Sequence, residues 1–430
     1  MAQTLKFGNK TWATKVGSTL AYNDENDNFK PLPFAFTRST SATRVNKQGL
    51  IEVVTNDRPR IDYTDTSDGV LLLEKAATNL ITYSESINQY TPVNGTITPN
   101  ALTSPEGLLN AVKFVENSAN NLHYFDSNSI SVTSGTKYTI SVFAKYNGRF
   151  LTFQGSGALN SAFATFNLQN GTIEQQSVGT ASIEKMTNDW YRCSIIVEMS
   201  QTGTAVMSIL LNDSAIGGRS RSYQGDGASG VYLYGFQVES GNLSSYIPTQ
   251  GSASTRVSET ASGSGNSEVF NDSEGVLFCD IAALVNSDTP RAISISDGTL
   301  NNRVYMYYST NNVLEVTIKV SGTDQASFSS TLSDSTLFNK LALKYKLNDF
   351  ALWINGFEVD FDLSGSVFST NTLDRLNLSY PNEIYNLYAK TKEIGYYNTA
   401  LTDLELETLT SYKSWTSMVN ELNLNIIYNG

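Results

Sequence analysis

Short segments in which apolar and polar residues alternate fill the middle of the chain, from about residue 83 to residue 250. Alternation with a period of two places successive side chains on opposite faces of a β-strand. The run 138–144 is the clearest example, and 190–197 and 231–239 have the composition of strands that are buried on at least one face. Because no helical pattern separates these segments, they predict a β-sandwich or jelly roll.

Asn-Gly pairs mark several of the turns that we expect between strands. They stand at 147–148, 170–171 and 355–356, each beside an apolar-rich segment. Both central residues of a type I′ turn need positive φ, which Asn and Gly tolerate better than other residues. Each pair therefore predicts a β-hairpin.

A single helix is predicted near the end of the chain. Thr402 and Glu405 have the spacing of a capping box, so the helix should begin after Thr402. Leu406 and Leu409 then recur at helical spacing, and the same face reaches Trp415.

Changes in composition divide the chain into segments. Residues 1–36 are polar and rich in turn-forming residues, and 258–268 are rich in Gly and Ser, like a flexible linker. The predicted order is an extended N-terminal arm at 1–36, a segment of distinct pattern at 37–82, a jelly-roll β-sandwich at 83–257, a linker at 258–268, a second β-sandwich at 269–412, and a helix end with a tail at 413–430.

The composition favours an all-β chain and narrows its partners. Of 430 residues, 16% are charged, whereas tyrosine is frequent with 23 copies. The formal net charge of -12 argues against a nucleic-acid surface, because phosphate neutralisation requires clustered lysine and arginine. No apolar run has the length of a membrane span and the N-terminus lacks a signal-peptide pattern, so we expect a soluble protein made in a cytoplasm, without membrane insertion.

The chain has few histidine and cysteine residues for catalysis or metal binding. His123 is the one histidine and has no nucleophile-elbow sequence around it, which favours a structural or surface role. Cys193 and Cys279 are far apart and lack CxxC spacing, which favours small buried residues over a disulfide or a zinc site. We therefore expect no enzyme, no metal and no cofactor.

Paired carboxylates are the remaining route to an enzyme, because two acidic side chains can cleave a glycosidic bond. Asp360 with Asp362, or Glu315 with Glu358, are available in the second sandwich. The chain has 41 acidic residues, so some pair is inevitable, and nothing in these spacings meets the geometric requirements of an active site.

Aromatic residues of the second sandwich are the candidate carbohydrate-binding residues. Tyr305, Tyr307 and Trp353, together with Tyr308, could form a flat apolar platform on which a sugar ring stacks without a metal. Alternation separates Tyr305 and Tyr307 from Tyr308, and the sequence leaves open which set faces the core. Core packing is the alternative for Trp353.

Two distant segments share Thr-Arg-Val after a run of small hydroxylated residues, at 43–45 and 255–257. The first copy continues through the segments 49–52, 58–60, 70–74 and 77–80. The run 34–80 resembles a module of bacteriophage tail-fibre, tail-spike and head-spike proteins, where it precedes β-rich domains that face the host. This resemblance implies a virion component, assembled in the cytoplasm of a bacterial host, in which 1–36 serves for attachment to the virion.

Each sandwich carries a further resemblance. The segments 141–145, 190–192 and 235–249 resemble the carbohydrate-binding-module type of jelly roll that recurs in phage fibres. The strand-turn-strand unit 350–361, with 392–406, resembles the C-terminal part of concanavalin-A-like, laminin-G-type domains. These resemblances imply the two folds, and they imply no sugar ligand.

We therefore expect a structural virion protein of a tailed phage that forms a head or tail fibre or spike. It would present a lectin-like, host-facing surface for receptor binding and host adhesion, with host-surface glycan and capsid or tail proteins as partners. Fibres need avidity because single lectin sites bind weakly, so a homotrimer is expected first and a dimer second. The alternatives are a capsid decoration or connector protein without a ligand, and a surface-polysaccharide depolymerase.

The repeated Thr-Arg-Val segments fall at the two junctions of the predicted domain order. Arg44 precedes the jelly roll, and Arg256 lies between the jelly roll and the second sandwich. We expect both arginines to make contacts between domains or between subunits.

Overall fold

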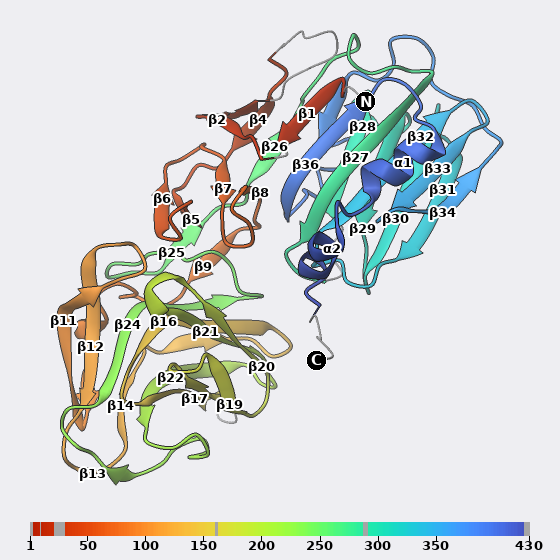
Figure 1. The fold of residues 1–430 in the computed structure, drawn as a ribbon. Coiled ribbons are helices and arrows are strands. Elements are labelled where there is room, and N and C mark those ends of the chain that lie inside the picture. Colours follow the sequence, from red (N-terminus) through yellow and green to blue (C-terminus); the bar gives the residue numbers. More distant parts are fainter. Residues whose placement is uncertain (1–2, 9, 21–30, 160–161, 287–290, 425–430) are drawn as a thin grey trace, which may run out of the picture. The chain divides into compact units, whose positions relative to one another are not determined.

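The computed structural model describes residues 3–8, 10–20, 31–159, 162–286 and 291–424, and these residues are almost entirely β (Figure 1). They form two compact units. Unit 1 consists of Met1–Ser41, Val54–Lys75 and Ser258–Gly430, and unit 2 consists of Ala42–Val53 and Ala76–Val257. Each unit is a sandwich of antiparallel sheets, so the all-β, multi-domain β-sandwich class expected from the sequence is confirmed.

Unit 2 contains the jelly roll. Its first sheet runs in the order β10 (Pro92–Val93), β14 (His123–Asp126), β22 (Gly203–Asn212), β17 (Phe150–Gly157), β18 (Phe163–Asn167) and β19 (Thr172–Gln176), and β15 (Ile130–Val132) also pairs with β22. Its second sheet runs in the order β11 (Gly95–Thr103), β12 (Leu109–Glu116), β24 (Gly230–Ser240), β16 (Lys137–Asn147), β21 (Tyr191–Glu198) and β20 (Thr180–Lys185).

The core of unit 2 lies between these sheets. Phe153 and Ile209 of the first sheet and Ile140, Ile195 and Val238 of the second are fully buried in one apolar cluster. The alternation seen in the sequence therefore sorts side chains into a core face and an outer face, as the pattern predicts.

The Asn-Gly turns have different outcomes. β18 and β19 pair across Asn170-Gly171, which confirms that hairpin. The hairpin prediction at Asn147-Gly148 is wrong, because β16 and β17 belong to opposite sheets. Only Gly148 of that pair has positive φ, so the turn carries the chain across the sandwich instead of reversing it within one sheet.

Unit 1 contains the concanavalin-A-like sandwich. Its larger sheet runs in the order β34 (Phe357–Asp362), β33 (Phe350–Ile354), β32 (Asn339–Lys346), β27 (Glu274–Ala283), β36 (Ala389–Tyr397), β8 (Val70–Leu72) and β7 (Arg60–Asp62), and β1 (Leu5–Gly8) also pairs with β36. Its smaller sheet runs in the order β31 (Thr323–Thr331), β30 (Val313–Val320), β29 (Arg303–Tyr308), β28 (Arg291–Ser296) and β35 (Arg375–Asn377).

β33 and β34 pair across Asn355-Gly356, and both turn residues have positive φ, which confirms this hairpin as well. The core of unit 1 lies between the two sheets. Leu277 and Leu343 of the larger sheet are buried in the same apolar cluster as Ile295 and Met306 of the smaller one.

The remaining strands form short ladders. They are β2 (Ala13–Lys15), β3 (Ser18–Leu20), β4 (Phe34–Thr37) and β26 (Thr260–Ser262) in one sheet, β5 (Ala42–Val45) with β6 (Ile51–Val54), β9 (Ala77–Asn79) with β25 (Ser254–Arg256), and β13 (Asn120–Asn121) with β23 (Tyr223–Gln224).

The start of the chain differs from the extended arm that its polar composition predicts. Residues 21–30 of that segment lie outside the described residues. β1 is a strand of the larger sheet of unit 1, and Phe7 is buried against Phe34 with ring centroids 4.3 Å apart. Two apolar side chains on one short strand suffice to bury it, because the strand joins a sheet that already exists.

The Gly/Ser-rich segment 258–268 is not a free linker. β26 pairs with β4, and the buried Ser264 hydroxyl donates to the Leu32 carbonyl at 2.7 Å. A Cβ at Gly265 would stand 2.5 Å from the Phe270 ring. The small residues therefore permit close packing, a role that composition cannot distinguish from flexibility.

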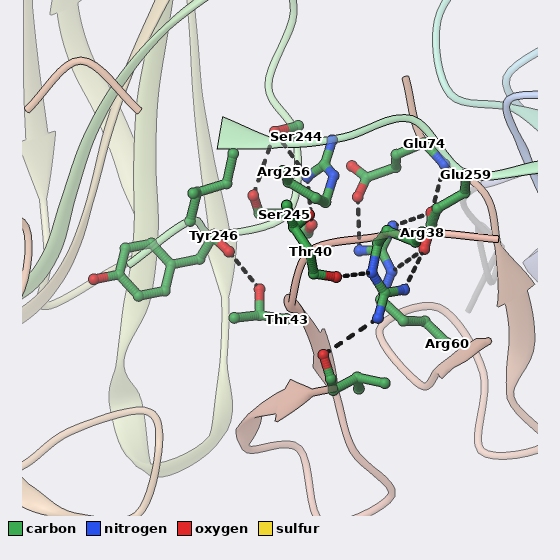
Figure 2. Close-up of polar contacts among 12 residues, drawn as sticks. Arg38, Thr40, Thr43, Arg60, Glu74, Ser244, Ser245, Tyr246, Arg256 and Glu259 are labelled. Carbon is green, nitrogen blue, oxygen red and sulfur yellow. Dashed lines mark hydrogen bonds and ion pairs between the residues drawn. The ribbon is translucent and has the colours of Figure 1, made fainter. Parts of the chain in front are cut away.

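A buried cluster of two arginines and two glutamates, the arginine–glutamate cluster, lies within unit 1 (Figure 2). Arg38 and Arg60 donate to the same Glu259 carboxylate, at 2.7 Å from Arg38 Nη1 and 2.8 Å from Arg60 Nε. Arg60 Nη1 also donates to Glu74 at 2.8 Å, and the Glu74 amide donates to Glu259 at 2.8 Å. The formal charges cancel, which is what makes burial of four ionised groups tolerable.

Backbone carbonyls accept hydrogen bonds from the remaining N–H groups of the Arg38 guanidinium. Its nitrogens donate to the carbonyls of Thr55 at 2.6 Å, Thr40 at 2.8 Å, Arg58 at 3.1 Å and Val54 at 3.2 Å. The Arg38 side chain thus holds the backbone of the segment 54–58 and of Thr40 around it. For Arg60, burial acts against the charged form, but Glu259 and Glu74 raise its pKa above the ordinary value.

α1 (Asp403–Thr410) confirms the predicted helix start. Thr402 and Glu405 form the capping box, and Leu406 is buried against the outer face of the larger sheet (Figure 1). The apolar face does not continue to Trp415, because the helix ends at Thr410 and a second one, α2 (Trp415–Glu421), leaves Trp415 exposed.

In the described part of the chain, no helix is long and apolar enough to cross a membrane. Cys193 and Cys279 are both free and buried, as their spacing predicts, and burial raises the pKa of each thiol well above its usual value.

Asp280 on β27 is a buried carboxyl in an unusual state. Its Oδ1 atom has no hydrogen-bond partner among the described residues. Burial raises its pKa to about 7, and the nearby Glu421 and Glu393 add to the rise, while Lys392 and Lys340 oppose it. The folded protein therefore holds a proton at Asp280 over a pH range in which the unfolded chain releases it.

The arginine–glutamate cluster yields a stability prediction. Glu259→Gln should lower the free energy of unfolding by about 3–5 kcal/mol, because it leaves a net buried positive charge on Arg38 and Arg60. Urea denaturation measures the change. Glu52→Gln, which breaks the partly exposed Arg44–Glu52 pair, is the matched control and should cost less than about 1 kcal/mol. Equal effects of the two changes would contradict the central role of Glu259.

Asp280 yields a prediction of pH dependence. Its folded pKa of about 7 exceeds the unfolded value of about 4, so its contribution to stability should fall as the pH rises from about 4 to 7. Asp280→Asn should therefore raise the free energy of unfolding at pH 8, by on the order of 2–4 kcal/mol, and change it little at pH 4. Urea denaturation of both proteins at the two pH values tests this, and a difference that does not depend on pH would contradict it.

Candidate functional site

The two faces of β29 have different environments. Val304, Met306 and Tyr308 are buried in the core of unit 1, and the Tyr308 hydroxyl donates to the Ile281 carbonyl at 3.3 Å. Tyr305 and Tyr307 therefore stand on the outer face of the smaller sheet. This settles the question that alternation left open, and it removes Tyr308 from the candidate platform.

Trp353 does not join Tyr305 and Tyr307. It lies on β33 of the larger sheet, is 6% exposed and packs with Phe278, Ala351 and Leu406 beneath α1. The prediction of one platform made of Tyr305, Tyr307 and Trp353 is wrong. Covering the larger sheet with a helix turns the outer side of β33 into a second core, which the strand pattern alone could not reveal.

Four tyrosines on the outer side of the smaller sheet form a continuous group, here called the tyrosine surface. Tyr305 and Tyr307 are stacked with ring centroids 5.4 Å apart and ring planes at 3°. Tyr380 contacts Tyr305 edge-on at 5.1 Å, and Tyr385 contacts Tyr380 edge-on at 5.6 Å. Tyr305 is buried by its neighbours, Tyr307 and Tyr380 are half-buried, and Tyr385 is 45% exposed.

The loop that follows β35 supplies Tyr380 and Tyr385. Its ends are held by the core residues Leu378 and Leu387, which share a backbone hydrogen bond of 2.8 Å. The Ala292 amide of β28 donates to the Tyr385 carbonyl at 3.1 Å. Tyr385 has φ +52°, a conformation that bulky residues rarely adopt, so the loop fixes this exposed ring at a conformational cost.

Sequence reasoning missed Tyr380 and Tyr385. The available signal was a pair of tyrosines in the turn-rich segment 379–385, in a loop between two strands. Loops on a rigid scaffold often carry binding residues, but nothing in the sequence places this loop over β28 and β29.

The tyrosine surface has polar groups at its edge. The Tyr307 hydroxyl donates to the Glu315 carboxylate on β30. Burial and then the hydrogen bond to Glu315 raise the pKa of Tyr307 above its ordinary value, and burial followed by the contact with Tyr380 does the same for Tyr305. Both phenols therefore stay neutral near pH 7 and keep their hydroxyl protons for hydrogen bonding.

Three positively charged side chains lie at one level across the strands of the outer face of the same sheet. They belong to Arg375, Arg303 and Lys319 and are here called the cationic row. Arg375 pairs with Ser296, Ser296 with Arg303, and Arg303 with Lys319 in the strand register, so all of them stand on the outer side. Arg303 also lies over the rings of Tyr305 at 4.8 Å and Tyr380 at 5.4 Å. The row therefore adjoins the tyrosine surface directly.

The two arginines of the Thr-Arg-Val repeats both belong to unit 2. Arg44 on β5 forms a partly exposed ion pair with Glu52 at 3.2 Å. Arg256 on β25 is buried, and its Nη1 donates to the hydroxyls of Ser245 at 2.8 Å and Ser244 at 3.4 Å (Figure 2). Neither arginine is fully solvated, and their expected role in contacts between domains or subunits stays a prediction.

His123 and the Glu315–Glu358 pair, which were considered for catalysis, are not brought together into one site. His123 is buried in unit 2, with Nδ1 2.7 Å from the Asn94 carbonyl oxygen and its ring against Tyr223. Glu315 and Glu358 lie on opposite sheets of unit 1. Within the described ranges, no three His, Cys, Asp or Glu side chains gather closely enough to hold a metal ion.

No protein-family model and no curated protein sequence matches the chain. Among solved structures, the CBM40 of the Ruminococcus gnavus IT-sialidase is similar at 15% identity over 35% of this chain and 94% of that chain, with a TM-score of 0.30. Domains LG4-5 of the mouse laminin alpha1 chain are similar at 11% identity over 70% of this chain and 90% of that chain, with a TM-score of 0.22.

A Trypanosoma rangeli sialidase solved in complex with sialic acid is similar at 8% identity over 91% of this chain and 81% of that chain, with a TM-score of 0.27. At these TM-scores the likenesses carry no argument about function. The assignment of β-sandwich folds rests on the strand order and on the cores described above.

Proposed function

We propose that this chain is a structural protein of a tailed-phage virion that forms a fibre or spike and binds host-surface carbohydrate through the tyrosine surface of unit 1. The virion role is supported by the resemblance of the segment 34–80 to phage fibre and spike proteins. The binding role is supported by one observation above all: Tyr305, Tyr307, Tyr380 and Tyr385 gather on an outer sheet face, where they are not needed for the core.

The tyrosine surface suits a sugar ring physically. Aromatic rings offer flat apolar faces to the C–H faces of a pyranose, while hydroxyl groups at the ring edges bond to sugar hydroxyls. Tyr307 and Tyr385 supply accessible rings, and Glu315 supplies an acceptor beside Tyr307. Tyr305 serves as the support behind Tyr307, because the parallel stacking of the two rings fixes the orientation of the more exposed one.

The proposal requires binding and no bond cleavage, so this chain is proposed not to be an enzyme. Glu315 already accepts the Tyr307 hydroxyl, and Asp360 and Asp362 alternate along one exposed strand. A capsid decoration or connector protein without a ligand is the main alternative, and a depolymerase is a second. A binding measurement separates the first alternative from the proposal, and the release of new reducing ends from host capsule would favour the second.

The tyrosine surface yields a binding prediction. Tyr307→Ala and Tyr385→Ala should each weaken binding to host cells or to a glycan array by about fivefold, because one stacked ring contributes on the order of 1 kcal/mol. Tyr146→Ala removes an exposed tyrosine of unit 2 and is the matched control. If the folded wild-type chain binds no glycan at micromolar concentration, the carbohydrate-binding role is wrong.

Assembly as a homotrimer is part of the proposal, and the edge strand β34 is its proposed contact. Phe357, Val359, Phe361 and Leu363 on and just after this strand are 73, 41, 55 and 67% exposed. An edge strand with so many exposed apolar residues is prone to associate with another chain, and proteins normally cover or charge such a strand. In a fibre made of several copies of this chain, a second copy would cover these apolar residues.

Charge indicates how two copies would meet at β34. Asp360 and Asp362 stand opposite Leu352 and Phe350, on the other side of the sheet from Phe361, so a continuous ladder between two β34 strands would place these carboxylates opposite carboxylates. The proposed contact is therefore between apolar side chains and not between strand edges. Phe361 stands opposite Ala351 on the α1 side of the sheet, which is the side we expect to be covered.

The assembly proposal is tested by mass in solution. Size-exclusion chromatography with light scattering should give the wild-type chain a mass three times that of its monomer, which is 47.0 kDa. Phe361→Lys should give the monomer mass, because the substitution places a charge in the apolar contact. Ile216→Lys changes an exposed apolar residue of unit 2 and should leave the mass unchanged. A monomeric wild type, or a trimer that Phe361→Lys leaves intact, would contradict the proposed contact.

A further inference from the structure

We infer that the carbohydrate bound at the tyrosine surface is acidic, and that Arg303 binds its carboxylate or sulfate group. This inference rests on the proposed carbohydrate-binding function and adds the chemical class of the ligand. Two observations carry it: the state of the Arg303 guanidinium, and the arrangement of charges along the cationic row.

Arg303 is a buried cation without a counter-ion. The residue is 7% exposed, its Nη1 donates to the Leu300 carbonyl, and its Nε has no partner among the described residues. No carboxylate of the described chain forms an ion pair with it, whereas Arg38, Arg60 and Arg149 each bond to glutamate. Because an ionised group of this kind is costly to bury alone, a binding anion would complete its environment.

The strand register concentrates positive charge at Arg303. Arg303 and Lys319 are direct cross-strand partners on the outer face, an arrangement of like charges that destabilises a sheet. Among the described residues, the acidic partners of the row stand at its two ends, where Lys319 Nζ lies 2.9 Å from Asp324 Oδ1 and Arg375 Nε lies 2.7 Å from Asp374 Oδ1. The centre of the row therefore has the excess positive charge.

The remaining carboxylates near the row lie beside Arg375. Asp297 and Glu383 both raise the pKa of Arg375 above its ordinary value, after the larger effect of Asp374. The Asp297 carboxylate accepts from Thr299 and from Asn302 at 2.8 Å each. These groups balance Arg375 and leave Arg303 as the place where an anion is best accommodated.

Arg303 is also placed where a stacked sugar would present its anionic group. The Arg303, Tyr305 and Tyr307 side chains follow one another along the outer face of β29, and alternate residues of a strand are about 7 Å apart. A sugar ring against Tyr380 therefore lies beside the guanidinium, which is 5.4 Å from the centre of that aromatic ring, whereas Tyr307 is two such spacings away along the strand. Arginine offers two parallel donors, which match the two oxygens of a carboxylate or sulfate.

The experiment compares matched ligands and matched variants. The full-length chain is applied to an array on which each oligosaccharide backbone is present in three forms: neutral, with a uronic acid, and with a sulfate. The two charged forms distinguish the sources of the anion. We expect the wild type to bind at least one charged form about tenfold more tightly than its neutral parent, and this preference to shrink as salt is added.

Variants assign the preference to Arg303. Arg303→Gln should bring the affinity for the charged form down to that for the neutral form, and Arg303→Lys should keep part of the preference, because it retains the charge without the paired donors. Lys319→Gln, at a less buried position, should reduce the preference without disturbing the fold. Arg221→Gln removes one surface positive charge of unit 2 and should change nothing.

The outcomes separate this inference from the function on which it rests. Equal binding of neutral and charged forms by the wild type, with loss of both in Tyr307→Ala, would overturn the acidic ligand and keep the carbohydrate-binding role. A preference for charged forms that survives in both Arg303→Gln and Lys319→Gln would overturn the role of the row. Absence of binding to every form would overturn the proposed function itself.

Discussion

The buried Glu259 carboxylate is the contact on which the arrangement of unit 1 depends. It accepts hydrogen bonds from Arg38 and Arg60 and from the backbone amide of Glu74, which belong to segments far from it in the sequence. Unit 1 is discontinuous, and the chain leaves it to form unit 2 before Glu259 returns. A neutral residue at this point would leave the Glu74 carboxylate alone against two buried guanidinium groups, so the contacts of Glu259 join the early strands to the late sandwich.

This join explains how a polar, turn-rich N-terminal region becomes part of a sheet. β1, β7 and β8 are too short to be stable alone, yet they extend the larger sheet of unit 1 beside β36. The same sandwich has one sheet covered by α1 and another whose outer side is covered in part by the loop that carries Tyr380 and Tyr385. Trp353 on the first sheet is therefore part of a core, whereas Tyr307 on the second is partly exposed.

Parts of the fold and of the candidate site follow from local sequence. The hairpins at 170–171 and 355–356 and the capping box of α1 were predictable, because the residues that make them are neighbours in the chain. The turn at 147–148 has the same local signal and a different outcome, since the next strand belongs to the opposite sheet. Trp353 failed as a binding residue for a similar reason: its neighbours come from a helix that starts some fifty positions later.

The all-β class, the alternation that separates Tyr305 and Tyr307 from Tyr308, and the local turns and caps can be read from the amino-acid sequence, because each depends on residues within a few positions of one another. The folded chain is needed to see which face of β29 points away from the core, which loop adds Tyr380 and Tyr385, and which glutamate accepts from both Arg38 and Arg60. These outcomes depend on pairing between segments far apart in the chain, where the burial of apolar surface and the cancellation of buried charge select one arrangement among many.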